Sequence, residues 1–467
     1  MSGSPAVFLQ GSLMRHVVVM SLTSSIGLMA VFAVDFVDMV FIAMLGNDAL
    51  AAAIGYAGTI LFFTNSINIG LAIVAGSLCA RAIGAGDSAL AGGHATTVSA
   101  IGIAVGILVP LAAIPALPAL LGLLGAEGEV ARLAARYLTI ILPSMSVMAV
   151  AMIAMAVLRA HGDARRAMLA TLYGGTVNAV LDPILIFGLG LGLDGAAIAS
   201  VIARFVILAA ALSTAISRHD AFALPNATAI ATGLRAALAL AVPAVLTNIA
   251  TPVGTAIVTR EVARFGTEAV AGMAVIGRLT PLAFAVVFAL SGAIGPIIGQ
   301  NFGAGRHDRV RAAFDAAVLF TLGYVVVAAA ILFVLRGPIT DLFAAEGEAR
   351  ALILLFCGPL ALASFFNGVI FVSNASFNNL GRPGWSTAIN WGRHTLGTWP
   401  FVTAGAALGG AAGALVGQAA GGVLFAALAW LLARRLMDGT MPPDGQTPGD
   451  PFAVQHSRWQ ILTGRHR

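Results

Sequence analysis

Apolar runs of membrane-spanning length follow one another along nearly the whole chain. A run of about 20 apolar residues crosses the roughly 30 Å of a bilayer's hydrocarbon core, and its backbone must then be helical to satisfy its own hydrogen bonds. The 467 residues are 59% hydrophobic and only 10% charged, far from the charge content of a soluble domain. The sequence therefore predicts an all-α, polytopic membrane protein.

Clusters of charged residues, glycine and proline divide the chain into twelve expected spans. Their approximate limits are 17–45, 51–80, 94–124, 133–158, 168–190, 195–217, 237–263, 269–300, 312–335, 349–379, 386–408 and 410–433. The net charge of +5 lies mostly in the loops between them. We interpret it as a topology signal and expect no nucleic-acid partner.

The two halves of the chain resemble each other. "AIGAGD" at 82–87 recurs as "NFGAGR" at 301–306, and "GAEGEVAR" at 125–132 recurs as "AAEGEARA" at 344–351. The same offset of 219 residues relates Gly162 to Gly381. The repeat is therefore six spans long, and an even number of spans gives both copies the same orientation. Parallel repeats of this kind are typical of secondary transporters with a central site between two lobes.

These patterns predict five segments. A cytoplasmic N-terminus (1–16) precedes a lobe of six helices (17–217). A cytoplasmic linker (218–236) leads to a second six-helix lobe (237–435), and a cytoplasmic tail (436–467) follows. Arginines gather in the loops after the even-numbered spans, so the positive-inside rule places both termini in the cytoplasm.

A few ionisable residues lie deep inside the expected spans, where a charge is costly and marks a functional site by default. They are Asp35, Asp38, Asp182, Arg204, Arg278 and Arg393.

Asp38 and Asp182 are expected at the same depth, about 12 Å from the outer helix ends at 1.5 Å per residue. Asn178 precedes Asp182 by four residues and shares its helix face. We therefore expect one pocket in the first lobe that carries the coupling ion. A proton carrier would use the two carboxyl groups, whereas a Na⁺ site at Asp38, Asn178 and Asp182 would add neutral oxygens. The sequence leaves both open.

Structural roles compete with these functional ones. Asp35 either tunes Asp38 or forms an ion pair with Arg204 or Arg278. Arg278 and Arg393 either face the cleft, as substrate or ion-pair candidates, or bind carbonyl groups at helix ends.

At these residues the chain resembles a known family. An acid before "LG..AL.A" in the first span, and "N...LDP...FG...G..GAAIA" across the fifth and sixth, are similar to the multidrug and toxic compound extrusion (MATE) family. The resemblance covers about residues 15–435. It implies that a cation gradient drives export of amphipathic, often cationic drugs by alternating access. Acids beyond residue 233 occur only near span ends or in loops, which fits the branch described as DNA-damage-inducible.

The resemblance also implies roles for single residues. The family's acid of the first span falls on Asp38, and its asparagine and aspartate of the fifth span fall on Asn178 and Asp182. Its tyrosine of the fourth span falls on Tyr137, and a threonine that follows its Gly-Ala-Ala block falls on Ser200, which keeps the hydroxyl.

One departure concerns the first span. Family members often carry a proline early in this helix, where bending is linked to ion release. This chain has "MSLTSSIGLMA" there, so any bend must rely on Ser24, Ser25 and Gly27.

We therefore expect a monomeric multidrug efflux antiporter of the inner (plasma) membrane that is not an enzyme. Its coupling ion is H⁺ or Na⁺, it needs no cofactor, and its partners are small amphipathic drug-like substrates and the lipid bilayer. The first alternative is a lipid-linked oligosaccharide flippase of the same superfamily. The second is a membrane-embedded, Mg²⁺-dependent prenyltransferase, because "DFVD" at 35–38 is a D-x-x-D motif.

Overall fold

Helices make up all the regular secondary structure in the part of the chain that the structure describes. The structure is a computed structural model, and it describes residues 6–440. Residues 1–5 of the expected N-terminal extension and residues 441–467 of the expected tail lie outside the described residues. The all-α fold class is confirmed.

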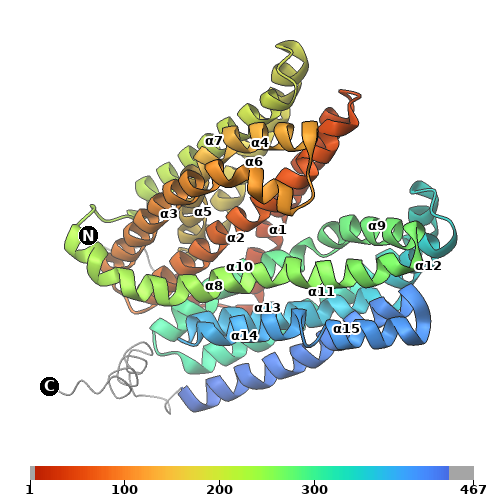
Figure 1. Cartoon of the computed structure of the whole chain (residues 1–467). Coiled ribbons are helices and arrows are strands. Elements are labelled where there is room, and N and C mark those ends of the chain that lie inside the picture. The colour runs from red at the N-terminus through yellow and green to blue at the C-terminus, as the bar shows by residue number, and fades with distance from the viewer. Residues whose placement is uncertain (1–5, 441–467) are drawn as a thin grey trace, which may run out of the picture. The chain divides into compact units, whose positions relative to one another are not determined.

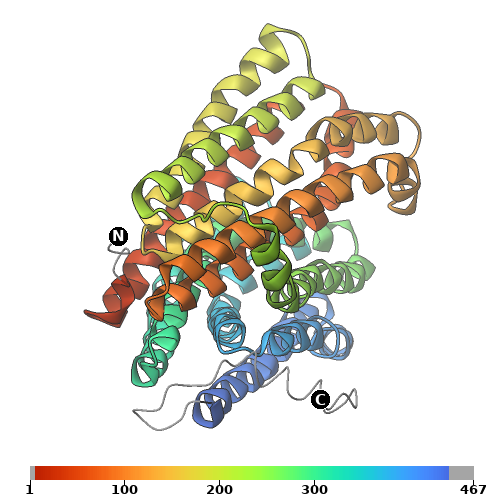
Figure 2. The same cartoon turned by 90° about the vertical axis from the view of Figure 1, so that its left-hand side faces the viewer.

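The first half of the chain forms seven α-helices with two short turns of other types (Figure 1). They are α1 (Leu13–Ala43), α2 (Asp48–Gly84), α3 (Ser88–Leu123), α4 (Gly128–Ile141), the 3₁₀ turn η2 (Leu142–Ser144), α5 (Met145–Ala160), α6 (Ala164–Pro183), the π turn η3 (Ile184–Gly188) and α7 (Leu193–His219). A 3₁₀ turn, η1 (Val7–Leu9), precedes them. Among these helices, α5 packs against both α3 and α7 (Figures 1 and 2).

The second half of the chain forms eight α-helices with two 3₁₀ segments (Figure 1). They are α8 (Ala227–Val262), η4 (Ala263–Phe265), α9 (Thr267–Ala283), α10 (Ala285–Gly303), α11 (His307–Leu342), α12 (Gly347–Cys357), η5 (Pro359–Ala363), α13 (Ser364–Asn379), α14 (Pro383–His394) and α15 (Trp399–Thr440). Here α13 is central, because it packs against α10, α11 and α15.

Eleven stretches of the described residues are long and apolar enough to cross a membrane. One of them, Pro383–Gly439, has 57 residues, about twice the length that a bilayer requires. Its backbone leaves the helical region at Gly409 (φ −148°) and at Gly410 (φ +63°). The stretch is therefore two crossings joined at these glycines, which agrees with the twelve expected spans.

The two crossings form an antiparallel hairpin with a seam of glycines. A Cβ atom at Gly421 would lie 1.5 Å from the carbonyl oxygen of Gly397, and one at Gly417 would lie 2.0 Å from that of Phe401. At Gly405 and Gly413 each added Cβ would meet the other residue's carbonyl oxygen at about the same distance. The backbones therefore touch directly, as small residues permit in membrane helix pairs.

Three expected spans are interrupted where the sequence weakens the helix. The span 133–158 contains Pro143 within η2, between α4 and α5. The span 269–300 breaks at Phe284, three residues after Pro281, and the span 349–379 breaks at Gly358, just before Pro359. A proline removes a backbone donor and clashes with the preceding turn, which accounts for the breaks at Pro143 and Pro359.

The expected linker 218–236 is mostly helical. Helix α7 continues to His219 and α8 begins at Ala227, so only residues 220–226 lie between them. Asp220 adopts a left-handed conformation (φ 46°) after α7, which ends that helix. Helix α8 therefore begins ten residues before the expected seventh span, 237–263.

Contacts divide the chain into two compact units. Among the described residues, unit 1 contains 26–79 and 87–241, and unit 2 contains 6–25, 80–86 and 242–440. Two helices thus belong to both units: α1 changes unit after Ser25, and α2 changes unit after Cys79. The lobe limits of 17–217 and 237–435 remain a prediction.

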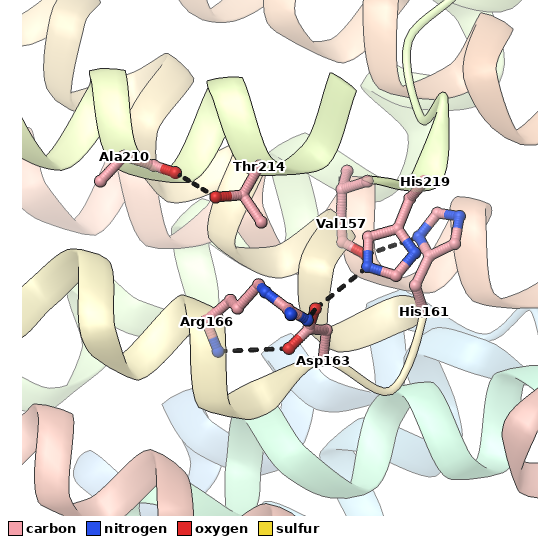
Figure 3. A network of polar contacts seen from close by, with 7 residues as sticks. All are labelled: Val157, His161, Asp163, Arg166, Ala210, Thr214 and His219. Carbon is pink, nitrogen blue, oxygen red and sulfur yellow. Dashed lines mark hydrogen bonds and ion pairs between the residues drawn. The ribbon is translucent and has the colours of Figure 1, made fainter. Parts of the chain in front are cut away.

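A polar cluster ties together three helix ends of unit 1 (Figure 3). Asp163 caps α6 by accepting a hydrogen bond from the backbone N–H of Arg166, and its carboxylate also binds the side chains of Arg166 and His219. The His161 and His219 rings lie 4.8 Å apart. Burial raises the pKa of Asp163, but the hydrogen bonds from His219 and Arg166 outweigh it and lower this pKa to about 2.

Candidate functional site: paired carboxyl groups in unit 1

The structure brings Asp38 of α1 and Asp182 of α6 together. The two carboxyl groups are close enough to interact electrostatically. Asp182 is fully buried, and Asp38 is half-buried. Two ionised carboxylates are both acceptors, so a hydrogen bond between them requires a proton on one of them. The pair is therefore chemically suited to hold a proton.

The chain around Asp182 departs from an ordinary α-helix. Pro183 ends α6, and residues Ile184–Gly188 form a π turn closed by a hydrogen bond of 2.8 Å from Leu189 N–H to the Ile184 carbonyl. Such π turns recur at functional sites, because they redirect side chains and release backbone groups. Asp182 thus lies at the point where the regular hydrogen bonding of its helix changes.

Several buried polar atoms at this site have no partner among the described residues. They are both carboxylate oxygens of Asp182, one of Asp38 and the side-chain amide nitrogen of Asn178. Asn178 is one turn before Asp182 on α6 and is 5% exposed. Buried polar groups are almost always paired in native proteins, so this set has the chemistry of an ion site. Carboxylate oxygens next to an amide would suit Na⁺ as well as a proton.

Tyr137 and Ser200 adjoin the carboxyl pair. The Tyr137 side chain, on α4, lies close to that of Ser200 on α7 and within electrostatic range of Asp38 and Asp182. An apolar cluster packs against Tyr137 and includes Ile42 of α1, Ile186 of η3 and Leu193 of α7. These side chains make the surroundings of the carboxyl pair largely apolar, which strengthens any electrostatic interaction there.

One of our alternatives paired Arg204 with Asp35, but the structure gives Arg204 other partners. It lies on α7, and its guanidinium donates to Ser144 Oγ at 2.9 Å and to the Ile141 carbonyl at 3.3 Å. Both acceptors lie at the η2 turn, where the helix is interrupted. The ion pairs found among the described residues do not include Asp35, and the Asp35 side chain is exposed. The proposed ion pair of Asp35 with Arg204 is therefore wrong for this structure.

The two remaining arginines lie in unit 2. Arg278 is exposed on α9. Arg393, on α14, donates a hydrogen bond to the side-chain oxygen of Asn367 on α13. Its partner is thus an asparagine rather than the helix-end carbonyl that we considered.

Sequence reasoning missed the residues that hold these arginines. Ser144 and Asn367 are single polar residues in apolar stretches, and that isolation was the available signal. It also missed the ion pair between Arg136 of α4 and Asp194 of α7, because nothing in the sequence relates two residues 58 positions apart. This pair joins the helices that carry Tyr137 and Ser200.

The fold and the site together define a class: a multi-pass helical membrane transporter built from two repeats, with buried acidic groups in the first. A family model described as MatE matches residues 23–184 and again residues 243–398, so it covers more than half of the chain and finds both repeats. The chain belongs to the MatE family of transporters and is not an enzyme.

Relatives among characterised proteins carry several names. A FAD transporter of Shewanella oneidensis is 27% identical over 433 residues, covering 90% of this chain and 94% of the relative. The multidrug export protein MepA of Staphylococcus aureus is 24% identical and covers 78% of this chain and 80% of its own. A probable multidrug resistance protein NorM of Thermotoga maritima is 25% identical over 53% of this chain and 55% of its own.

Solved structures match the whole fold. The MATE transporter VcmN of Vibrio cholerae in its bent form superposes with a TM-score of 0.85 at 27% identity, covering 91% of this chain and 97% of that one. A point mutant of the same transporter gives a TM-score of 0.87 with the same identity and coverage. These likenesses confirm the two-lobe transporter fold.

Proposed function

We propose that this chain is an inner-membrane antiporter that exports small amphipathic, often cationic compounds in exchange for protons, and that it belongs to the DNA-damage-inducible branch. The proximity of Asp38 and Asp182 carries the proposal, because two neighbouring carboxyl groups whose buried oxygens have no partner among the described residues can share a proton. The names of the MepA and NorM relatives support drug export.

Coupling follows from competition for these carboxyl groups. In one state they are ionised and favour a cationic substrate in the cavity. In the other state protons neutralise them, and the substrate leaves. The ion and the substrate thus stabilise different states, which is the thermodynamic condition for exchange. Na⁺ is the alternative ion, and it would be bound by Asp38, Asp182 and the amide oxygen of Asn178.

The test is ethidium transport in proteoliposomes, with a pH gradient and a Na⁺ gradient imposed separately. Wild type is compared with Asp38→Asn and with Asp35→Asn, which changes an exposed acid on the same helix. We expect transport on the pH gradient that Asp38→Asn abolishes and Asp35→Asn largely retains. Transport that needs the Na⁺ gradient would show that the carboxyl pair binds Na⁺ as the coupling ion. Normal pH-driven transport by correctly folded Asp38→Asn would refute the proposal.

A second candidate substrate is a flavin nucleotide. The observation that favours it is the Shewanella oneidensis relative named as a FAD transporter, which matches over 90% of this chain. The same proteoliposomes would be loaded with FAD and its release followed by fluorescence. Release driven by a cation gradient, with ethidium not transported, would establish the flavin substrate.

A further inference from the structure

Two helix ends cross at backbone distance in unit 2. A Cβ atom at Gly84, the last residue of α2, would lie 2.0 Å from the carbonyl oxygen of Gln300 on α10. A Cβ atom at Gly303, the last residue of α10, would lie 2.0 Å from the carbonyl oxygen of Arg81 on α2. No other residue fits at either glycine without moving the backbone.

This crossing follows the internal repeat. Gly84 and Gly303 are 219 residues apart, and so are Arg81 and Gln300. The contact is therefore made twice by equivalent residues, as at a two-fold axis. The sequence of the "AIGAGD" and "NFGAGR" pair reflects this geometry, since the glycines that allow the crossing occupy the same place in both.

A second contact joins the chain's beginning to the same place. The segment formed by residues 6–11, here called the N-terminal segment, docks through Phe8, which is 1% exposed. Phe8 N–H donates to Gln300 Oε1 at 2.9 Å, and Asn301 Nδ2 donates to the Phe8 carbonyl at 3.2 Å. Gln300 therefore meets the N-terminal segment with its side chain and α2 with its backbone.

Arg309 fixes this arrangement from α11. Its Nη2 donates to the Phe8 carbonyl at 3.0 Å and to the Gly11 carbonyl at 3.2 Å, while its Nε donates to Asn301 Oδ1 at 3.0 Å. Gln300 and Asn301 are fully buried. Charge-assisted bonds to two carbonyls and one amide are stronger than neutral ones, so Arg309 supplies the strongest polar contacts of the N-terminal segment.

These contacts involve the two helices that change unit. The bodies of α1 and α2 belong to unit 1, but residues 6–25 and 80–86 belong to unit 2. In a transporter of this class the two repeats rearrange during each cycle. The places where helices of one unit are attached to the other must then bend or separate, because packed contacts switch between discrete arrangements.

We propose that the N-terminal segment is a latch: it holds the end of α2 against α10 through Gln300, Asn301 and Arg309, and it is released in the opposite state of the transport cycle. The inference rests on the transporter class and requires neither the coupling ion nor the substrate proposed above.

The native thiols report on this latch. Cys79 is fully buried at the point where α2 changes unit, and Cys357 is fully buried in α12. Cys79 would be studied in a Cys357→Ser background, and Cys357 in a Cys79→Ser background. The measurement is the rate of maleimide labelling of the detergent-solubilised protein. Arg309→Gln removes the central donor. Arg306→Gln is the matched control, because Arg306 lies in the same turn but pairs with Asp308 at the surface.

We expect Arg309→Gln to raise the labelling rate of Cys79 by about 3-fold or more, because loss of contacts that favour one state shifts a two-state equilibrium toward the other, and to leave Cys357 unchanged. Arg306→Gln should match wild type at both thiols. Phe8→Ala, which leaves α10 and α11 intact, should act like Arg309→Gln.

Other outcomes would overturn the latch. Unchanged labelling of Cys79 in Arg309→Gln and Phe8→Ala would show that the N-terminal segment is static packing. Equal acceleration at both thiols in Phe8→Ala would show that the segment supports the whole fold rather than one contact. Neither readout uses a gradient or a substrate, so the latch and the proposed function can fail separately.

Discussion

The carboxyl groups of Asp38 and Asp182 lie close enough to interact electrostatically, although the residues are on separate helices and 144 positions apart in the chain. The contact joins α1 to the end of α6, where the helix changes to a π turn. Any movement of α1 therefore changes the surroundings of a buried carboxyl group, and any change in its protonation affects α1.

The first prediction concerns Asp182→Asn. The amide can still donate a hydrogen bond to Asp38, so we expect the fold to be kept and the thermal midpoint in detergent to stay close to that of wild type. Gradient-driven efflux should fall at least ~10-fold, because one partner no longer exchanges a proton and coupling free energies are of this size. Asp35→Asn is the control. Retained efflux in folded Asp182→Asn would contradict the role of the pair.

A second prediction tests the contact between Tyr137 and Ser200. Tyr137→Phe and Ser200→Ala each remove one hydroxyl, and we expect each to lower efflux about two- to tenfold, which corresponds to one hydrogen bond of roughly 0.5–1.5 kcal/mol. The double variant should be no worse than the single ones, because both remove the same bond. Ser200→Thr keeps the hydroxyl and should remain active. Additive losses in the double variant would show that the two residues act independently.

The core of this site could be predicted because a membrane makes charges conspicuous. Asp38, Asn178 and Asp182 were found from their place in apolar runs and from counting residues along two helices. The rotation of each helix about its axis is not encoded in hydropathy, however. For this reason the partners of Arg204 and Arg393 were missed. Their contacts with Ser144 and Asn367 depend on which side each helix turns toward its neighbour.

Other parts of the fold could not be derived for different reasons. The N-terminal segment is too short to show a period, so the docking of Phe8 onto Gln300 has no signature in the sequence. The repeat did align Gly84 with Gly303, but only the packing shows that each glycine faces the other copy's carbonyl. In α1, unit 1 begins directly after Ser25. This boundary lies beside the serines at which we expected any bend of the helix.

A third prediction concerns acid stability and Asp163. Its pKa is about 2 in the folded protein against an ordinary value of 3.8, so the ionised form stabilises the fold above about pH 4. That contribution, about 2 kcal/mol by linkage, is lost as the pH falls from about 4 through 2. Asp163→Asn should therefore lower the thermal midpoint in detergent at pH 7, and the difference from wild type should shrink below pH 4.

The control for this measurement is Asp308→Asn, whose side chain is 59% exposed. It should change the midpoint little at any pH, since exposed ion pairs contribute only about 0–1 kcal/mol. A constant difference between Asp163→Asn and wild type from pH 7 to pH 3 would show that hydrogen bonding to His219 and Arg166 does not depend on the charge of Asp163.

The last prediction concerns the glycine seam in α15. In Gly417→Ala the added methyl group would meet the Phe401 carbonyl oxygen at 2.0 Å, so the two crossings must move apart along the seam. We expect a destabilisation of about 1–3 kcal/mol, the usual result of overpacking, seen as a lower thermal midpoint and a lower yield of folded protein.

Gly422→Ala is the matched control on the same helix, because nothing lies within 4 Å of the position its methyl group would take. Since alanine favours helix over glycine by up to about 1 kcal/mol, Gly422→Ala should be neutral or slightly stabilising. Equal midpoints for the two variants would mean that the backbones of the hairpin do not touch at Gly417.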